Sequence, residues 1–220
     1  MKQIKKILVL MVSFSFFQVM EANAQDADPE YVKVTLERAD KIVQTLDISD
    51  EEKKERVKQT IAKEYRDLSA LQDKQSARLE AEKKALKDNP EKWERKKLSL
   101  ENKSQKELDR LRKSFLTSLK KDLNEGQITA VKDGLTYNVA PNTYQVYVEM
   151  LPELTTDQKE FVQKNLVEAR EHAFMAGSSK DKHAWFGKYK GRINNYLAAE
   201  GYNLKEASEI MEAKMREKNQ

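Results

Sequence analysis

Cysteine is absent from this 220-residue sequence, and glycine, proline and histidine are scarce, with six, four and two residues. A chain without cysteine forms no disulfide bonds, so packing between its elements must hold the fold together. It also offers no thiol for nucleophilic catalysis. Two histidines without an H-E-x-x-H spacing do not indicate a metal site. We therefore expect neither a metal nor a cofactor.

A phosphate-binding loop is missing as well. The segment G-K-Y-K-G at residues 187–191 has two glycines but lacks the G-K-[ST] ending and the strand–loop–helix context of such loops. A Gly-x-x-x-Gly face lets another helix or a ligand approach closely, and of these two roles we favour helix packing. The 37 acidic residues are too numerous for any two to stand out as a catalytic pair.

The N-terminus has the three parts of a secretory signal peptide. Three lysines precede an apolar run at residues 7–20, and Ala22-Asn23-Ala24 follows as a small-residue cleavage site. The run is shorter than the roughly 20 residues that span a bilayer. We therefore expect residues 1–24 to be cleaved and the mature chain, Gln25–Gln220, to be periplasmic or secreted. It would contact the membrane only through the signal peptide before cleavage.

Charge gives no reason to expect nucleic acid as a partner. Residues 1–24 contain three lysines and one glutamate, so the formal net charge falls from +4 to +2 without them. Such a nearly neutral chain lacks the basic surplus of nucleic-acid-binding proteins. Charged residues nevertheless make up 35% of the sequence. This content is typical of long helices with solvated faces.

The first half of the mature chain favours long helices, since residues 25–125 contain no glycine. We predict a first helix over residues 31–46. A capping box at Ser49-Asp50-Glu51-Glu52 begins a second helix that runs to about residue 87. Asn89-Pro90 separates it from a third helix at about 91–121. Two long helices joined by a short turn form an antiparallel hairpin arm, residues 50–121, whose polar middle at 73–107 we expect to project into solvent.

The second half, residues 122–220, contains all the glycines and most of the aromatic residues. Capping boxes at Asn124–Gln127 and Thr155–Gln158 begin helices that end near residues 134 and 175. We predict a loop at 135–140, a short helix from Pro141 to Met150, and helices at 180–200 and 204–218. The sequence therefore predicts an all-α fold: one helical domain, residues 25–220, in which an aromatic-rich bundle carries the hairpin arm.

Two aromatic blocks, residues 132–147 and 177–202, have the composition of a sugar-binding surface. Aromatic rings pack on the apolar face of a pyranose, while amide and guanidinium groups reach its hydroxyls. The spacing of Trp185, Tyr189 and Tyr196 is also typical of a helical core, so both interpretations stay open. The candidate ligand-binding residues are Tyr137, Asn138, Tyr144, His183, Trp185, Tyr189, Arg192, Asn195, Tyr196 and Tyr202.

The sequence resembles the domain-of-unknown-function family numbered 3826 over nearly all of the mature chain. The segments that carry the resemblance are E-R-A-D-K-I-V-Q-T-L (37–46), V-K-D-G-L-T-Y-N-V-A-P-N-T-Y (131–144), M-L-P-E-L-T (150–155) and the long segment 168–197, which includes H-A-W-F-G-K-Y-K-G-R. That family consists of exported proteins of bacteria that digest plant polysaccharides. The resemblance implies a candidate sugar-binding role and no assigned activity or functional residues.

A second resemblance is to the periplasmic Spy/CpxP chaperones. Their Leu-Thr-x-x-Gln signature matches Leu154–Gln158, and residues 48–52 and 123–127 match it loosely. The leading hypothesis is an exported, non-catalytic binding protein for an oligosaccharide or another exported protein, linked to polysaccharide utilisation. The alternative is a chaperone or envelope-stress adaptor. An enzyme is the third hypothesis, and it requires His172, His183 and Arg192 to converge in one pocket.

Overall fold

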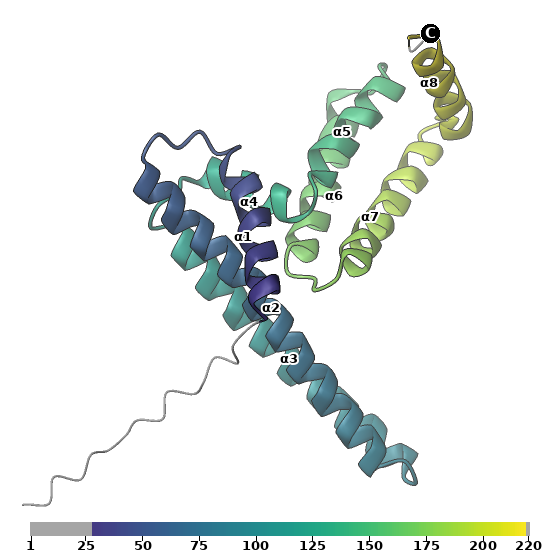
Figure 1. Ribbon diagram of the computed structural model, residues 1–220. Coiled ribbons are helices and arrows are strands. Elements are labelled where there is room, and N and C mark those ends of the chain that lie inside the picture. Colours follow the sequence, from purple (N-terminus) through teal and green to yellow (C-terminus); the bar gives the residue numbers. More distant parts are fainter. Residues whose placement is uncertain (1–27, 219–220) are drawn as a thin grey trace, which may run out of the picture.

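The computed structural model describes residues 28–218, so the expected signal peptide, residues 1–24, lies outside the described part. Residues 28–218 form eight helices and no strand, which confirms the all-α prediction (Figure 1). The helices are α1 (Pro29–Val43), α2 (Glu51–Ala85), α3 (Pro90–Leu119), α4 (Glu125–Leu135), α5 (Val139–Met150), α6 (Thr156–Ala173), α7 (Ser179–Ala199) and α8 (Leu204–Lys218).

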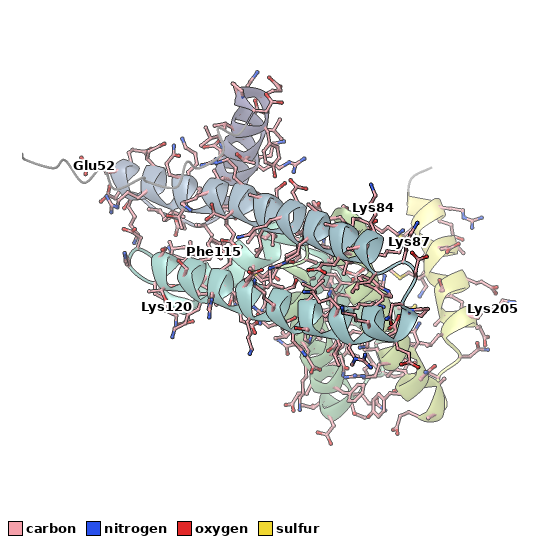
Figure 2. The ribbon with its side chains drawn as sticks, turned by 90° about the horizontal axis from the view of Figure 1, so that it is seen from below. Glu52, Lys84, Lys87, Phe115, Lys120 and Lys205 are labelled. Atoms are coloured by element: carbon pink, nitrogen blue, oxygen red, sulfur yellow. The ribbon has the colours of Figure 1, made fainter. Side chains whose placement is uncertain are left out.

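Helices α2 and α3 form the predicted antiparallel hairpin. Asn89 caps α3 by accepting a hydrogen bond from the backbone N–H of Lys92 at 3.0 Å, and Pro90 fits the first turn because it needs no donor there. Figure 2 shows Glu52 and Lys120 at one end of the hairpin and Lys84 and Lys87 at the other. The outer half extends away from the other helices in Figure 1, as its polar sequence predicts.

Ion pairs, rather than a broad apolar seam, join the outer halves of α2 and α3. Arg78 Nη2 lies 2.9 Å from Glu107 Oε2, and Lys96 Nζ lies 2.8 Å from Glu82 Oε1. Both pairs are partly exposed, so each contributes little to stability on its own. Leu100 is buried in the outer half, but most of the buried apolar residues of the arm lie in its inner half.

The first hydrophobic core lies at the inner end of the hairpin, where α1 and α4 pack on it. Gly134 permits the close approach of α4 to α1, because a Cβ there would lie 2.8 Å from Cγ1 of Ile42. Main contributors from the hairpin are Val57, Ile61, Leu68, Phe115 and Leu119, and those from the packed segments are Ala39, Ile42, Leu46, Val131, Leu135, Phe174 and Met175.

The second hydrophobic core lies between α5, α6 and α7, with α8 packed at one end. Helices α6 and α7 are antiparallel and make the most extensive contact of this half. Figure 1 shows α5–α8 on the side of the molecule opposite the tip of the hairpin arm. The buried side chains of this second core include Tyr147, Val162, Leu166, Phe186, Tyr189, Ile193 and Leu197.

Side-chain caps begin most of these helices. The two capping boxes predicted at Asn124–Gln127 and Thr155–Gln158 are present, with both reciprocal hydrogen bonds. The prediction for the second helix was wrong by one residue: Asp50, not Ser49, is the cap and accepts from the N–H of Lys53 at 3.0 Å. A carboxylate at this position both accepts the hydrogen bond and complements the positive end of the helix.

The expected loop at residues 135–140 is shorter than predicted. Helix α4 continues to Leu135 and α5 begins at Val139, two residues before Pro141. Tyr137 and Asn138 make the tight bend between them with positive φ angles of 58° and 55°. This backbone conformation is disfavoured for tyrosine, and it turns the chain within three residues.

The two cores are joined by residues at the end of α6 and the start of α7. Phe174 and Met175, which follow α6, are buried in the first core rather than the second. Arg112 of α3 donates a hydrogen bond to the backbone carbonyl of Glu171 at 3.1 Å. The side chain of Gln72, on α2, packs directly on Gly177. A Cβ atom at residue 177 would lie 1.5 Å from Nε2 of Gln72.

Candidate functional site

The aromatic residues predicted on α7 lie mainly in its contact with α6. The ring of Trp185 is half-buried and stacks on the exposed His172, with centroids 4.3 Å apart and planes 13° apart. Tyr189 is buried, and the guanidinium carbon of Arg192 lies 4.8 Å from the centre of its ring. These ring faces therefore serve helix packing to a large extent.

Tyr196 and Tyr202 are also engaged within the bundle. The ring of Tyr196 packs on Phe161 of α6 with centroids 4.0 Å apart. The hydroxyl of Tyr202 donates a hydrogen bond to Oε1 of Gln158 at 2.8 Å. Asn195 is exposed on the outer face of α7. The α7 residues thus form a packed aromatic surface. Trp185, Tyr189 and Arg192 line none of the hollows between helices that are described below.

Tyr137, Asn138 and His183 meet at the bend between α4 and α5. Tyr137 is 53% exposed, and its ring stacks on His183 with centroids 5.9 Å apart. Asn138 is exposed next to it and makes no side-chain cap for α5. This group is separate from the α6–α7 surface.

The two histidines and Arg192 do not converge. His183 and Trp185 are two positions apart on α7, so their side chains leave the helix in directions about 200° apart. Because His172 stacks on Trp185, the two histidines lie on different sides of α7. The arrangement that the enzyme hypothesis required is therefore not found among the described residues.

The packing role predicted for Gly187 and Gly191 was wrong. Both glycines are exposed, and a Cβ built at either position would meet no atom of the described residues within 4 Å. The reason is the orientation of α7: its buried face carries Phe186, Tyr189 and Ile193, and the two glycines lie on the other side.

A hollow between α4, α5 and α6 contains the remaining predicted residue, Tyr144. Its volume is about 410 Å³, within the range of small-molecule sites. Its apolar lining comes from Tyr144, Ala140, Pro141, Leu166 and Val167. We call it the Tyr144 pocket.

Uncharged polar groups and one ion pair complete the Tyr144 pocket. Thr129, Gln145 and Gln163 contribute a hydroxyl and two amides, and all three side chains are exposed. The ion pair joins Asp133 of α4 to Arg170 of α6, with Nη1 of the arginine 3.1 Å and 3.2 Å from the two carboxylate oxygens. An apolar ring beside amide, hydroxyl and charged groups is the combination that sugars require.

The Asp133–Arg170 pair belongs to a larger charged network. Arg170 Nη2 lies 3.3 Å from Glu171 Oε1, and Lys132 Nζ lies 2.7 Å from Glu171 Oε2. Burial raises the pKa of Asp133, although the neighbouring Arg170 acts in the opposite direction. The carboxylate is therefore poorly solvated and gains from any further hydrogen-bond donor.

Sequence reasoning missed Asp133, Gln145, Gln163 and Arg170. A partial signal exists, because Gln163 and Arg170 are seven residues apart and share one face of a helix. Asp133 and Gln145 also lie inside the first aromatic block. What the spacing does not give is that the faces of three helices meet at one place.

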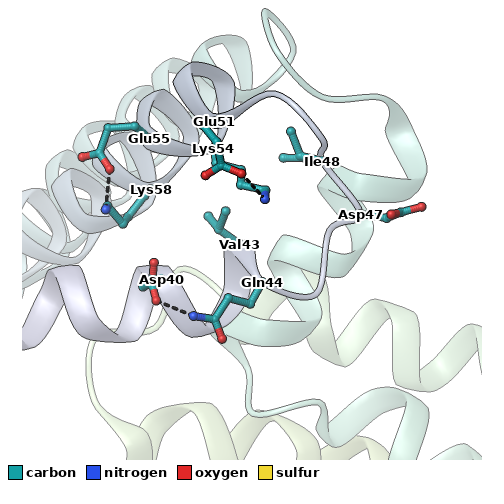
Figure 3. Close-up of a pocket in the computed structure, with 9 residues that line it drawn as sticks. All are labelled: Asp40, Val43, Gln44, Asp47, Ile48, Glu51, Lys54, Glu55 and Lys58. Atoms are coloured by element: carbon teal, nitrogen blue, oxygen red, sulfur yellow. Dashed lines mark hydrogen bonds and ion pairs between the residues drawn. The ribbon is translucent and has the colours of Figure 1, made fainter.

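A second hollow, with a volume of about 450 Å³, lies between the end of α1 and the start of α2 (Figure 3). Its charged groups are largely paired with each other: Lys54 with Glu51 at 2.6 Å and Lys58 with Glu55. No aromatic side chain lines it.

A third hollow, between α5 and α8, is lined by Tyr202, three glutamates and several aliphatic residues. The third hollow also contains the amide of Asn203, but this amide is bonded to Glu206 and the hydroxyl of Tyr202 is bonded to Gln158, so the Tyr144 pocket offers more free uncharged polar groups.

Within residues 28–218, no three histidine or acidic side chains gather as a metal site would require. In the same range, no helix has the length and apolar composition needed to cross a membrane.

The fold and the pocket define an all-α protein with a helical arm and a small, largely uncharged hollow in its C-terminal half. The chain matches the family described as "Protein of unknown function (DUF3826)" over residues 32–217 and belongs to that family. No curated protein matches the chain significantly.

Proposed function

We propose that this protein is a non-catalytic carbohydrate-binding protein whose sugar site is the Tyr144 pocket. The observation that carries the proposal is the meeting of an aromatic ring, a proline ring, two amides and a paired carboxylate in one hollow of about 410 Å³. The resemblance noted from the sequence, to exported proteins of polysaccharide-digesting bacteria, supports the same role.

Each part of the pocket has a counterpart in a sugar. The ring of Tyr144 and the side chains of Pro141 and Val167 offer apolar contact to the C–H groups of a pyranose. Gln145 and Gln163 both donate and accept, which suits hydroxyls that do the same. Asp133 accepts hydroxyl donors, and its orientation is fixed by Arg170.

Binding is favoured over hydrolysis by the number of carboxylates at the pocket. Glycoside hydrolysis uses two carboxyl groups about 5–10 Å apart, one on each side of the bond that breaks. Asp133 is the one carboxylate among the described lining residues, and it is paired with Arg170.

We propose that the protein acts outside the cytoplasm after loss of residues 1–24, where oligosaccharides released from polysaccharides are present.

The chaperone alternative requires a continuous apolar surface for unfolded clients. Among residues 28–218, six large apolar side chains are well exposed, and they are divided among α3, α5, α6, α8 and the bend after α4 with at most two on any one element. The carbohydrate proposal is therefore the better supported of the two.

Isothermal titration calorimetry of the purified protein with hemicellulosic and pectic oligosaccharides tests the proposal. We expect binding by at least one of them, and a loss of about tenfold or more in Tyr144→Ala because the ring contact is removed. Tyr137→Ala removes an exposed ring outside the pocket and should leave the affinity unchanged. Thermal melting of both variants verifies that each is folded.

Two results would overturn the proposal. One is the absence of heat with every sugar at millimolar concentration. The other is a loss of binding in Tyr137→Ala but not in Tyr144→Ala, which would move the site to the bend. A parallel assay of aggregation of an unfolded client protein decides whether the chaperone alternative takes its place.

A further inference from the structure

We infer that the Tyr144 pocket takes an uncharged sugar unit and excludes uronic acids and other anionic sugars. This inference rests on the proposed function and specifies its ligand. It follows from the charges that line the pocket and from what each of them already contacts.

Only two of the described lining residues are charged, and they neutralise each other. Asp133 and Arg170 are in direct contact, and their side chains are only 16% and 9% exposed. The other polar lining groups, from Thr129, Gln145 and Gln163, are uncharged. An anionic ligand would therefore enter a pocket with no net positive charge to offset its desolvation.

Both terminal nitrogens of Arg170 already contact carboxylates of this chain. Its Nη1 bonds to both oxygens of Asp133, and its Nη2 bonds to Glu171. Its Nε is buried and has no hydrogen-bond partner among the described residues. Because carboxylates bind arginine best through two adjacent N–H groups, a uronate would have to compete with Glu171 or displace Asp133, whose largely buried carboxylate would lose its partner.

Asp133, by contrast, still has acceptor capacity. A carboxylate offers about four lone-pair sites, and Arg170 occupies only some of them. Hydroxyl donors of a ligand satisfy the remaining lone pairs of Asp133. A ligand carboxylate has no donor to offer and is repelled by the negative charge of Asp133. The volume of about 410 Å³ lies at the lower end for small-molecule pockets, which suits one or two sugar rings.

Matched glycosides that differ only at C6 test this inference. Methyl glucoside is compared with methyl glucuronide, and methyl galactoside with methyl galacturonide, by calorimetry at neutral pH. We expect the neutral member of at least one pair to bind about tenfold or more tightly than its acid, because the acid carries an uncompensated charge into the pocket. Oligomers of the same sugars are used where the single unit binds weakly.

Gln163 offers a matched pair of charge variants, since it is exposed on α6 and its substitution does not disturb the core. Gln163→Lys should strengthen binding of the uronate severalfold, and Gln163→Glu should weaken it further. Because Gln163 lines the proposed site, each variant is read as the ratio of the uronate affinity to the neutral-sugar affinity, which should rise in the lysine variant and fall in the glutamate variant.

Uronate binding as tight as that of the neutral sugar would overturn the inference. If Tyr144→Ala abolished that uronate binding, the proposed function would stand and only the ligand class would be wrong. If neither neutral nor acidic sugars bound, the proposed function would fail and this inference with it.

Discussion

The ammonium group of Lys182, on α7, donates a hydrogen bond to the backbone carbonyl of Leu135, at the end of α4, across 2.8 Å. Both side chains are buried, and the carboxyl group of Glu64 on α2 lies in the same region with one oxygen, Oε1, unbonded among the described residues. Burial raises the pKa of Glu64 to about 8 and lowers that of Lys182 to about 8. This junction between the arm and the C-terminal half therefore titrates near neutral pH.

Glu64→Gln should remove a loss of stability that develops as the pH rises from about 4.5 to about 8. The folded protein keeps the proton on Glu64 up to about pH 8, whereas the unfolded chain loses it near 4.5, so the folded state loses stability as the pH rises between these values. The slope from one group is at most about 1.4 kcal/mol per pH unit. Urea unfolding at several pH values from 5 to 9 should show a flatter profile in the variant.

Glu80→Gln, at an exposed position on the same helix, is the control and should follow the unsubstituted protein. Parallel profiles for Glu64→Gln and the unsubstituted protein would show that Glu64 is ionised in the folded state.

Lys182 acts in the opposite sense: its lowered pKa makes the folded state gain stability as the pH rises from about 8 to 10.5. Lys182→Met should remove that gain.

Gly134→Ala should destabilise the contact between α4 and α1. The new Cβ would lie 2.8 Å from Cγ1 and 3.2 Å from Cδ1 of Ile42, which is buried in the first core. Overpacking of this kind costs about 1–3 kcal/mol. Denaturant unfolding of a double-mutant cycle with Ile42→Ala checks the cause, because the alanine should be harmless once the isoleucine is shortened. An equal cost in both backgrounds would contradict the explanation.

Gly187→Ala and Gly191→Ala should each stabilise the protein. Both positions lie inside α7, on its exposed face, where a Cβ meets no described atom within 4 Å. Alanine in an exposed helix interior is more favourable than glycine by about 0.5–1 kcal/mol. A rise in the melting temperature is expected for each variant. A fall would show that these glycines contact something after all, as the sequence-based packing hypothesis supposed.

Tyr147→Phe should weaken the connection between α5 and α7. The hydroxyl of Tyr147 donates to Oδ1 of Asn194, and burial raises the pKa of this tyrosine to about 12, so it stays a donor at alkaline pH. Loss of such a hydrogen bond costs about 0.5–1.5 kcal/mol. Denaturant unfolding should show this loss and no similar loss in Tyr144→Phe. Combination with Asn194→Ala should give less than the sum of the two costs, and full additivity would argue against the bond.

The sequence predicted the helical class and most helix boundaries because those depend on nearby residues. Asn89-Pro90 marks the turn of the hairpin, and Asn124 and Thr155 mark helix starts, through hydrogen bonds that span only a few residues. Where local signals competed, the prediction was less accurate: Asp50 replaced the adjacent Ser49 as the cap, and α5 began before Pro141.

The candidate site was predicted only in part, and the reason is physical. The aromatic composition pointed to the C-terminal half, and Tyr144 was among the residues named. Whether a ring packs inside or lines a hollow depends on which helix faces it, as Trp185 and Tyr189 show by their contacts with His172 of α6. Periodicity describes one helix at a time, so it does not distinguish these outcomes.

By itself, the sequence determined a cysteine-free, all-helical chain with a long polar hairpin, because helix propensity, capping and the absence of glycine act within a few residues. Only the tertiary structure decided that Asp133 of α4 meets Arg170 of α6 beside Tyr144 of α5, and that Glu64 and Lys182 are buried together. Such meetings depend on how complete helices pack against one another, and the energies that choose among packings come from many weak contacts spread along the whole chain.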